Sequence, residues 1–270
     1  PERIEHAIKA LRKGTMPGGS GVTIDLVADP SLRAQLAKHV SALACKCFTN
    51  GLLTPQMREA IISILYKGKG DRDLCKSHRP VSLTDVTCRI IDKALQLALN
   101  DVMGTVLCGV NIAFLPKQRM ERDTLSMAEI ARYCHRNQGG GIACLDADKA
   151  YDRVEIGFLK EILAAMRFPD AFIDVVATMY RDNWARLKVN GHVGDAFRQT
   201  NGLRQGLPSS CPLWLIFIEP LVRRLRDDPE LEGVTIPGEL GRGPVKEKVA
   251  AFADDAQCYC AHMAGVCRLT

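Results

Sequence analysis

The sequence lacks any apolar run long enough to cross a membrane, and it lacks the opening pattern of a secretory signal. Its first residues, PERIEHAIKALRKG, are charged and amphipathic instead, and the chain does not begin with Met. Because a membrane-spanning helix needs about 20 consecutive apolar residues, we expect no membrane span and no membrane partner. The missing Met leads us to expect an excised piece of a longer protein.

Cysteine pairs with the C-x-x-C spacing are also missing. The chain has 11 cysteines, an odd number, but no C-x-x-C pair, and several of them lie within apolar runs. Scattered cysteines of this kind favour reduced, buried thiols in an intracellular protein over a disulfide framework. The alternative is a zinc site built from Cys45, Cys47 or Cys75.

What the chain does have is an ordinary globular composition with an uneven charge. Of its 270 residues, 47% are hydrophobic and 25% are charged, which suits one large domain or two packed subdomains. Residues 1–140 carry 20 Lys and Arg against 13 Asp and Glu, a net charge of +7, whereas residues 141–270 carry 16 against 18, a net charge of −2. The basic first part suits a polyanion, although a solvated basic face is the commoner cause of such a bias.

Hydrophobic periodicity predicts helices in the first part of the chain and mixed strands and helices in the second. Asp29 is the expected cap and Pro30 the first residue of one helix, and Asn190-Gly191 indicates a type I′ hairpin turn. The predicted helices cover residues 2–13, 29–49, 85–102, 120–137, 156–166, 170–182 and 212–228, and the strand-rich segments are residues 59–71, 143–145, 184–197 and 249–259. This order of elements predicts an α+β fold.

The run QGGGI at residues 138–142 is the predicted domain boundary. Its three glycines end the preceding helix before a short apolar strand begins. We therefore expect two domains, residues 1–141 and residues 142–270.

Acidic residues occupy two places that otherwise suit a buried strand. Asp254 and Asp255 interrupt the run KVAAFADDAQCYC at the predicted tip of a hairpin, and Asp146 follows a short apolar strand in CLDADKAYD. Burying a carboxylate is unfavourable unless a partner compensates its charge. Mg²⁺ prefers oxygen ligands, and two such ions about 3.5–4 Å apart can hold the attacking and leaving oxygens of a phosphoryl transfer. The residues alone leave two interpretations open, a divalent-cation site or an ordinary turn, with Asp148 and Asp152 in a solvated helix start.

Three motifs, in this order and spacing, resemble the palm motifs of reverse transcriptases: LDADKAYDRV, NGLRQGLPSSCPLWLIFIEPL and AFADDAQCYC. The segment RLKVNGHVGDAFRQTNGLRQG is similar to the version found in non-LTR, LINE-type retrotransposons. Upstream, LRKGTMPGGSG, ILYKGKGDRDLCKSHRPVSLTDVTCRIIDKAL and AFLPKQRMERDTL resemble further stretches of the same family. Each motif is short, but together they cover nearly the whole chain, which makes the combination specific.

This resemblance implies a right-hand polymerase fold, with helical fingers at residues 1–141, a palm with a small antiparallel sheet at residues 142–270, and no thumb. It implies RNA-directed DNA polymerase activity, in which a primer 3′-hydroxyl attacks the α-phosphate of a deoxynucleoside triphosphate. The implied partners are an RNA template, a DNA primer, deoxynucleoside triphosphates, and the remainder of a polyprotein that carries an endonuclease and a thumb. The implied location is the nucleus, and we expect the isolated fragment to be weak or inactive.

Carried over position by position, the resemblance makes Asp146, Asp254 and Asp255 the catalytic, metal-binding acids. The backbone carbonyl of Ala147 is a further implied ligand, and two Mg²⁺ ions are implied, for which Mn²⁺ can substitute. The residues expected to contact the nucleotide are Lys67, Arg79, Arg119, Tyr151 and Gln205, and those expected to contact template or primer are Gly202, Arg204 and Gly206. Arg suits phosphate because its planar fork donates two parallel hydrogen bonds. For Tyr151, a tyrosine of the core is the alternative.

The sequence departs from the family pattern at several points. Ser20 stands where the family usually has Asp, Leu207 replaces a common Cys, and Ser210-Cys211 shift the pattern that follows. The run Pro116-Lys117-Gln118-Arg119 breaks the family's Pro-Gly-Arg, so Arg119 is matched across one inserted residue. None of these changes removes an implied metal ligand.

Three alternative functions stay open. The first is a group II intron or bacterial reverse transcriptase. The second is a decayed copy that binds nucleic acid without catalysis. The third is an unrelated metal-dependent phosphotransferase or nuclease that uses the same acids and has no need of Tyr151 or of the loop at residues 202–206.

Overall fold

The computed structural model describes residues 1–114, 120–137, 139–237, 244–262 and 265. The chain divides into two compact units, each made from two separate segments. Unit 1 contains Pro1–Asp101 and Tyr151–Ser210, and unit 2 contains Val102–Ala150 and Cys211–Thr270. This division differs from the predicted single boundary after residue 141, because the glycines there separate a helix from a strand inside unit 2.

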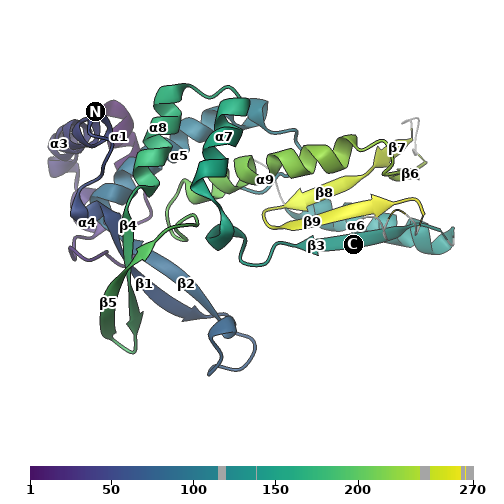
Figure 1. Cartoon of the computed structure of the whole chain (residues 1–270), viewed down its shortest axis with the longest axis horizontal. Helices are drawn as coiled ribbons and strands as arrows, with labels where there is room; N and C mark the ends of the chain where they lie inside the picture. Colours follow the sequence, from purple (N-terminus) through teal and green to yellow (C-terminus); the bar gives the residue numbers. More distant parts are fainter. Residues whose placement is uncertain (115–119, 138, 238–243, 263–264, 266–270) are drawn as a thin grey trace. The chain divides into compact units, whose positions relative to one another are not determined.

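Helices and strands are both abundant, which confirms the predicted α+β class (Figure 1). In chain order the helices are α1 (Glu2–Ala10), α2 (Ile24–Val27), α3 (Pro30–Thr49), α4 (Pro55–Arg58), α5 (Val86–Val106), α6 (Met120–Arg136), α7 (Ile156–Ala165), α8 (Asp170–Tyr180) and α9 (Ser210–Asp227), with the 3₁₀ turns η1 (Cys75–Ser77) and η2 (Ala150–Arg153). The strands are β1 (Glu59–Tyr66), β2 (His78–Thr84), β3 (Gly141–Asp146), β4 (Asn183–Val189), β5 (His192–Gln199), β6 (Val234–Ile236), β7 (Val245–Glu247), β8 (Val249–Phe252) and β9 (Asp255–Cys260). Within the described residues, no helix is both long and apolar enough to span a bilayer.

Unit 1 contains a four-stranded sheet in the order β2-β1-β4-β5. Strand β1 runs antiparallel to β2 and parallel to β4. The hairpin β4–β5 turns at Asn190 and Gly191, with φ of 49° and 86°, as the Asn-Gly pair predicts. Helix α3 begins as predicted, because Asp29 accepts a hydrogen bond from the backbone N–H of Ser31 (2.8 Å) and Pro30 is the first helical residue.

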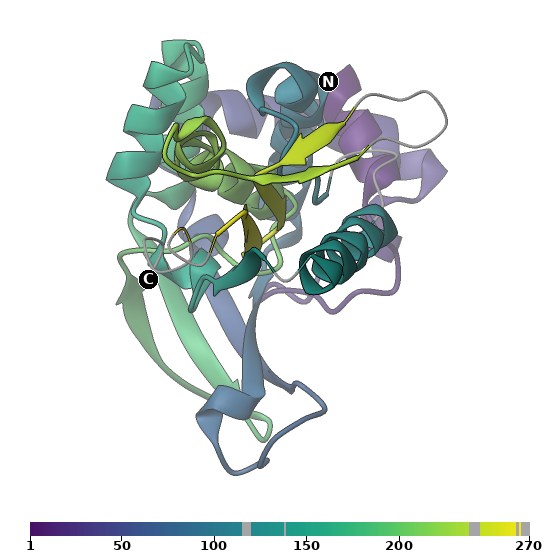
Figure 2. The same ribbon diagram turned by 90° about the vertical axis from the view of Figure 1, so that its right-hand side faces the viewer.

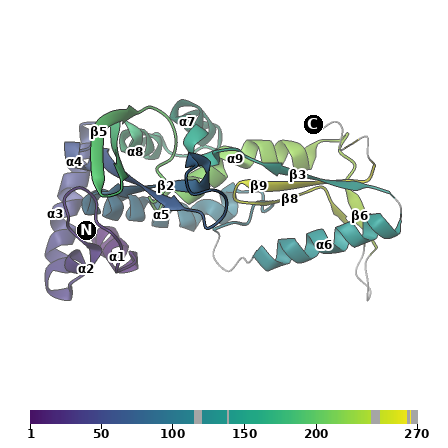
Figure 3. The same cartoon turned by 90° about the horizontal axis from the view of Figure 1, so that it is seen from below.

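Unit 2 contains a three-stranded antiparallel sheet in the order β3-β9-β8. Figures 2 and 3 show α9 over one face of this sheet and α6 over the other. Because side chains alternate along a strand, Ala143 and Cys258 pack with Leu225 of α9, whereas Tyr259 packs with Ile130 of α6. Burial on both faces holds the strand ends in place, and the acidic residues lie at those ends.

The cysteines of unit 1 that could have formed a zinc site are separated along its elements. Cys45 and Cys47 lie on α3, and Cys75 lies in η1, between β1 and β2. All ten cysteines in the described part of the chain are free thiols.

Candidate active site

The acids predicted to be catalytic meet at one end of the three-stranded sheet of unit 2. Strand β3 ends at Asp146, strand β9 begins at Asp255, and the register pairs these two residues directly. Residues that oppose each other in an antiparallel pair project from the same face, with Cβ atoms about 4.5–5.5 Å apart. The ladder therefore places two carboxylates from distant parts of the sequence side by side.

Asp254 lies beside this pair, in the two-residue turn between β8 and β9. Phe252 and Asp255 close the turn as its last paired residues, and Ala253 has a φ of 58°. The backbone N–H of Ala147 donates a hydrogen bond to the carbonyl oxygen of Asp254 (3.4 Å). This bond ties the turn to the residue that follows Asp146, so the structure brings together all four positions of the predicted metal site.

The carboxylates are less buried than their apolar surroundings suggested. Asp146 and Asp255 are exposed and Asp254 is half-buried, although the residues around them suit a buried strand. The strands end here, and the sheet no longer covers the side chains. Loss of hydration nevertheless raises the pKa of Asp255, and the negative charges of Asp254 and Asp146 raise it further.

The donor atoms at this end of the sheet fit a divalent cation in chemistry. Carboxylate and carbonyl oxygens are the ligands that Mg²⁺ prefers, and a cation would relieve the repulsion between the acids. The Ala147 carbonyl accepts the N–H of Ala150 (3.1 Å), which leaves a second lone pair for an ion. Among the residues that the structure describes, no three His, Cys, Asp or Glu side chains stand close enough together to hold a metal ion. Coordination by all three acids therefore requires side-chain rotation.

Two buried side chains that the sequence analysis did not single out hold the turn. The Asn111 side chain donates to the carbonyl oxygen of Ala253 (3.1 Å) and accepts its backbone N–H (3.1 Å). The indole N–H of Trp214 donates to the same carbonyl oxygen (3.0 Å). The one signal for this role in the sequence is a lone amide in the otherwise apolar run CGVNIAF.

The loop that contains the predicted template contacts packs on η2 in unit 1. The backbone N–H of Gly202 donates to the carbonyl of Val154 (2.8 Å), and that of Leu203 donates to the carbonyl of Tyr151 (2.8 Å). Gly202 has a φ of 91°, and a Cβ there would lie 2.9 Å from the carbonyl oxygen of Asp152. Only glycine fits this close approach, so the loop and Tyr151 are held together.

The next part of the loop joins strand β2. The carbonyl of Gln205 accepts the backbone N–H of Ser82 (2.7 Å), and its side chain donates to Asp152 (3.3 Å). Gly206 is exposed and has a φ of 117°. The predicted nucleotide contacts Tyr151 and Gln205 are therefore neighbours within unit 1.

Arg204 has a different place from the one predicted. Its side chain is 1% exposed, and its guanidinium donates to the carbonyl oxygens of Met57 (3.1 Å) and Arg58. Burial lowers the pKa of Arg204. The structure therefore gives this side chain a packing role beneath α4, in place of the predicted contact with template.

The predicted phosphate contacts of the β1–β2 hairpin remain at the surface. Lys67 and Arg79 are both exposed, and Arg79 is paired with Leu65 across the ladder. The ammonium of Lys67 donates to the carbonyl of Lys76 (2.8 Å), which closes the loop. Arg119 lies outside the described residues.

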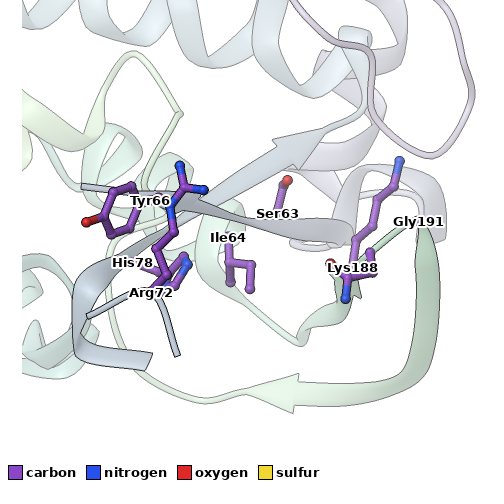
Figure 4. Close-up of a pocket in the computed structure, with 8 residues that line it drawn as sticks. Ser63, Ile64, Tyr66, Arg72, His78, Lys188 and Gly191 are labelled. Carbon is purple, nitrogen blue, oxygen red and sulfur yellow. The ribbon is translucent and has the colours of Figure 1, made fainter. Parts of the chain in front are cut away.

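A pocket of about 330 Å³ lies between this hairpin and the turn of β4–β5 (Figure 4). The guanidinium carbon of Arg72 lies 4.8 Å from the centroid of the Tyr66 ring, and that ring lies 5.7 Å from the ring of His78. The pocket is lined by Ser63, Ile64, Tyr66, Arg72, His78, Lys188, Asn190 and Gly191. None of these lining residues is acidic. The aromatic side chains suit the base of a nucleotide, and the basic side chains suit its phosphate.

Comparisons with known proteins identify the family of the chain. The family model of the reverse transcriptase (RNA-dependent DNA polymerase) matches residues 67–267. The Transposon TX1 uncharacterized 149 kDa protein of Xenopus laevis is 28% identical over 256 residues, which is 94% of this chain and 19% of that protein. The Retrovirus-related Pol polyprotein from type-2 retrotransposable element R2DM of Drosophila melanogaster is 28% identical over 187 residues, 66% of this chain and 16% of that protein. A Pol polyprotein from type-1 retrotransposable element R2 of Nasonia vitripennis is 29% identical over 178 residues, again 66% of this chain and 16% of the polyprotein.

The chain belongs to the reverse transcriptase (RNA-dependent DNA polymerase) family. Its relatives confirm the prediction of a reverse transcriptase domain of the non-LTR retrotransposon type. The chain spans less than a fifth of the length of these relatives, 19% and 16% for the first two.

Proposed function

We propose that this chain catalyses RNA-directed DNA synthesis, the addition of deoxynucleotides to a primer along an RNA template. The observation that carries the proposal is the register of unit 2, which pairs Asp146 with Asp255 beside the turn that contains Asp254. In the right-hand description of polymerases, the sheet of unit 2 serves as the palm and the β1–β2 hairpin of unit 1 serves as part of the fingers.

The proposed mechanism uses the chain mainly for binding and orientation. The carboxylates of Asp146, Asp254 and Asp255 and the carbonyl of Ala147 would hold two Mg²⁺ ions, for which Mn²⁺ can substitute. When bound, these ions stabilise the charge of phosphoryl transfer and lower the pKa of the attacking hydroxyl. The carboxylates themselves would anchor the ions.

The residues of unit 1 are proposed to bind the nucleotide and the template. Lys67 and Arg79 would donate hydrogen bonds to the triphosphate, because both residues are exposed and their side chains are cationic. Tyr151 and Gln205 would contact the incoming nucleotide, and the backbone at Gly202 and Gly206 would approach the template. Base pairing reads the sequence of the template. The protein therefore needs only charged and stacking contacts with the nucleic acid.

The experiment is extension of a DNA primer on an RNA template by a single deoxynucleotide, with the 270-residue chain in excess and Mg²⁺ or Mn²⁺ present. The chain is in excess so that a single addition of a nucleotide can be followed. Asp254→Asn should lower the rate about 100- to 1,000-fold, since it removes a ligand worth several kcal/mol of charge stabilisation. The matched control is Asp195→Asn, at an exposed position of β5, which should keep the wild-type rate. Equal rates for Asp254→Asn and wild type would refute the proposal.

A second candidate, nucleic-acid binding without catalysis, is favoured by the spacing of the acids. In the described part of the chain they are not gathered closely enough to hold an ion without rearrangement. This candidate predicts that the wild-type chain binds a primed RNA template but adds no nucleotide with either metal ion.

The unrelated phosphotransferase or nuclease is distinguished through Tyr151. As a nucleotide contact, its ring should help to discriminate deoxynucleotides from ribonucleotides, so Tyr151→Ala should relax that discrimination. Unchanged discrimination in competition assays would favour the unrelated enzyme.

The wider setting of the chain is also a proposal. The length of its relatives suggests a polyprotein partner with further activities, and we place its action in the nucleus. Imaging of a fluorescent fusion tests the location, and a signal confined outside the nucleus would contradict it.

A further inference from the structure

The turn that carries Asp254 has an unfavourable backbone. Ala253 adopts a φ of 58°, in the left-handed region that is unfavourable for a residue with a Cβ. Glycine or asparagine would adopt it with less strain, but this position holds alanine. The conformation must therefore be stabilised from outside the hairpin.

Asn111 supplies that stabilisation with both ends of its amide. Its side-chain NH₂ donates to the carbonyl of Ala253 and its side-chain oxygen accepts the N–H of the same residue, each at 3.1 Å. The same oxygen also accepts the N–H of Ala113 (3.4 Å). Only an amide offers a donor and an acceptor in this geometry, so a hydrophobic side chain of equal size cannot replace it.

The surroundings make this contact rigid. Asn111 is 1% exposed, and its backbone forms a parallel bridge with Ala251 of β8. Trp214, also buried, adds a second donor to the Ala253 carbonyl (3.0 Å). A buried polar group that lost these partners would be left unsatisfied, so the turn has one strongly preferred arrangement.

The residue after this strained alanine is one of the proposed metal-binding acids. Asp254 follows Ala253 directly, and its own carbonyl accepts the N–H of Ala147. The turn is thus held on one side by Asn111 and Trp214 and on the other by the residue after Asp146. We propose that Asn111 is a positioning residue, which sets the direction of the Asp254 carboxylate and thereby the affinity of the acid cluster for divalent cations. The proposal rests on the proposed function, because it assumes that these acids hold the ions.

The main test measures Mn²⁺ binding to the 270-residue chain by electron paramagnetic resonance titration, without nucleic acid. Asn111→Leu keeps the side-chain size but removes the hydrogen bonds, and it should weaken Mn²⁺ binding about 10- to 100-fold, as loss of a group that orients a ligand does. Trp214→Phe keeps an aromatic ring and removes one donor, so it should weaken binding less. If Asn111→Leu lowers stability too far, the Trp214→Phe result decides.

The matched control is Asn183→Leu. Asn183 is also buried, and its side chain donates to the carbonyl of Met179 (3.2 Å), but it belongs to unit 1, whereas the turn belongs to unit 2. This variant should lower stability without changing the dissociation constant for Mn²⁺. A residue that merely supports the fold would behave like this control, because unfolding reduces the number of sites and not their affinity.

Primer extension gives a second measurement. For Asn111→Leu, excess Mn²⁺ should restore much of kcat, while KM for the nucleotide stays at the wild-type value, because unit 1 is unchanged. An Mn²⁺ affinity for Asn111→Leu equal to that of Asn183→Leu would overturn the inference. If Asp254→Asn itself binds Mn²⁺ as tightly as wild type, the metal site of the proposed function fails instead, so the two failures are distinguishable.

Discussion

The hairpins β4–β5 and β8–β9 both reverse direction in two residues, but different forces hold their turns. In β4–β5 the turn residues Asn190 and Gly191 are exposed, and a Cβ at Gly191 would meet nothing within 4 Å. Both residue types adopt positive φ readily, so the turn forms from local preference. In β8–β9 the positive φ falls on Ala253, and buried side chains from elsewhere in unit 2 hold it.

The turn of β4–β5 therefore contributes to the fold alone, whereas the turn of β8–β9 also positions a residue of the candidate site. A locally encoded turn needs no partners and can lie free at the edge of a sheet. A turn stabilised by tertiary contacts is fixed only in the folded protein, but it can hold a residue chosen for chemistry, here Asp254, next to a strained neighbour. The following predictions test this comparison, from the largest expected effect to the smallest.

Ala253→Val should give the largest loss of stability. A β-branched residue at a φ of 58° is strained further than alanine, so the free energy of unfolding should fall by about 2–3 kcal/mol. Urea unfolding followed by circular dichroism measures the change. If Ala253→Val lowers the free energy of unfolding by less than Gly191→Ala does, the turn of β8–β9 is not the strained one.

The loop at residues 202–209 extends the comparison, because it is held by a buried acid. Asp92 accepts hydrogen bonds from the backbone N–H (2.7 Å) and the hydroxyl (2.5 Å) of Ser209. Burial raises the pKa of Asp92 to about 6, although these bonds and the positive charges of Arg204 and Lys93 oppose the rise. Cys88 and Tyr180 also lie near this carboxylate.

This raised pKa predicts a pH-dependent stability. The pKa of this carboxyl is about 4 in the unfolded chain, so between that value and the folded one the folded chain binds the proton more tightly. The free energy of unfolding therefore falls as the pH rises through about 4–6. The total fall is on the order of 2 kcal/mol. Asp92→Asn should flatten this part of the curve, whereas the exposed Asp195→Asn should leave it unchanged. Chemical unfolding at pH 4.5 and pH 7 measures the slope, and identical slopes for wild type and Asp92→Asn would contradict the prediction.

Gly191→Ala should cost about 1 kcal/mol, because a φ of 86° is unfavourable for alanine although space for the methyl group is open. Urea unfolding followed by circular dichroism measures this loss. A loss above about 3 kcal/mol would show that tertiary contacts also hold the β4–β5 turn.

Ala253→Gly should have the smallest effect, a change of less than about 1 kcal/mol in the free energy of unfolding. Glycine relieves the strain of the positive φ, but it increases the conformational entropy of the unfolded chain. A gain much larger than this would mean that Asn111 and Trp214 leave most of the strain uncompensated, and thermal unfolding is sufficient to detect it.

Much of this architecture was predictable from the residues. Every predicted helix is present within a few residues, and both predicted hairpins form. Strand β2 and the short elements α2, α4, β6 and β7 were missed, because runs of three to seven residues carry little periodicity. The unit boundary was misplaced, since a compact unit built from two distant segments leaves no single break in the sequence.

For the site, the predictions were uneven for a physical reason. Asp146, Asp254 and Asp255 stand out because acids interrupt apolar strands, and the ladder pairs Asp146 with Asp255. Arg204 gave no sign of burial, because an arginine that binds phosphate and one that binds backbone carbonyls have the same sequence signature. Asn111 was missed because its partner is the backbone of a turn, which no sequence pattern marks.

By itself the sequence determined the elements whose causes are local. Periodic apolar residues specify the helices, the Asn-Gly pair specifies one turn, and the order of the motifs specifies the family. Only the tertiary structure decided which distant residues face each other: the register that pairs Asp146 with Asp255, the amide of Asn111 that stabilises Ala253, and the burial of Arg204. Those outcomes depend on side chains competing for the same buried space and the same hydrogen-bonding groups, and this competition exists only once the chain has folded.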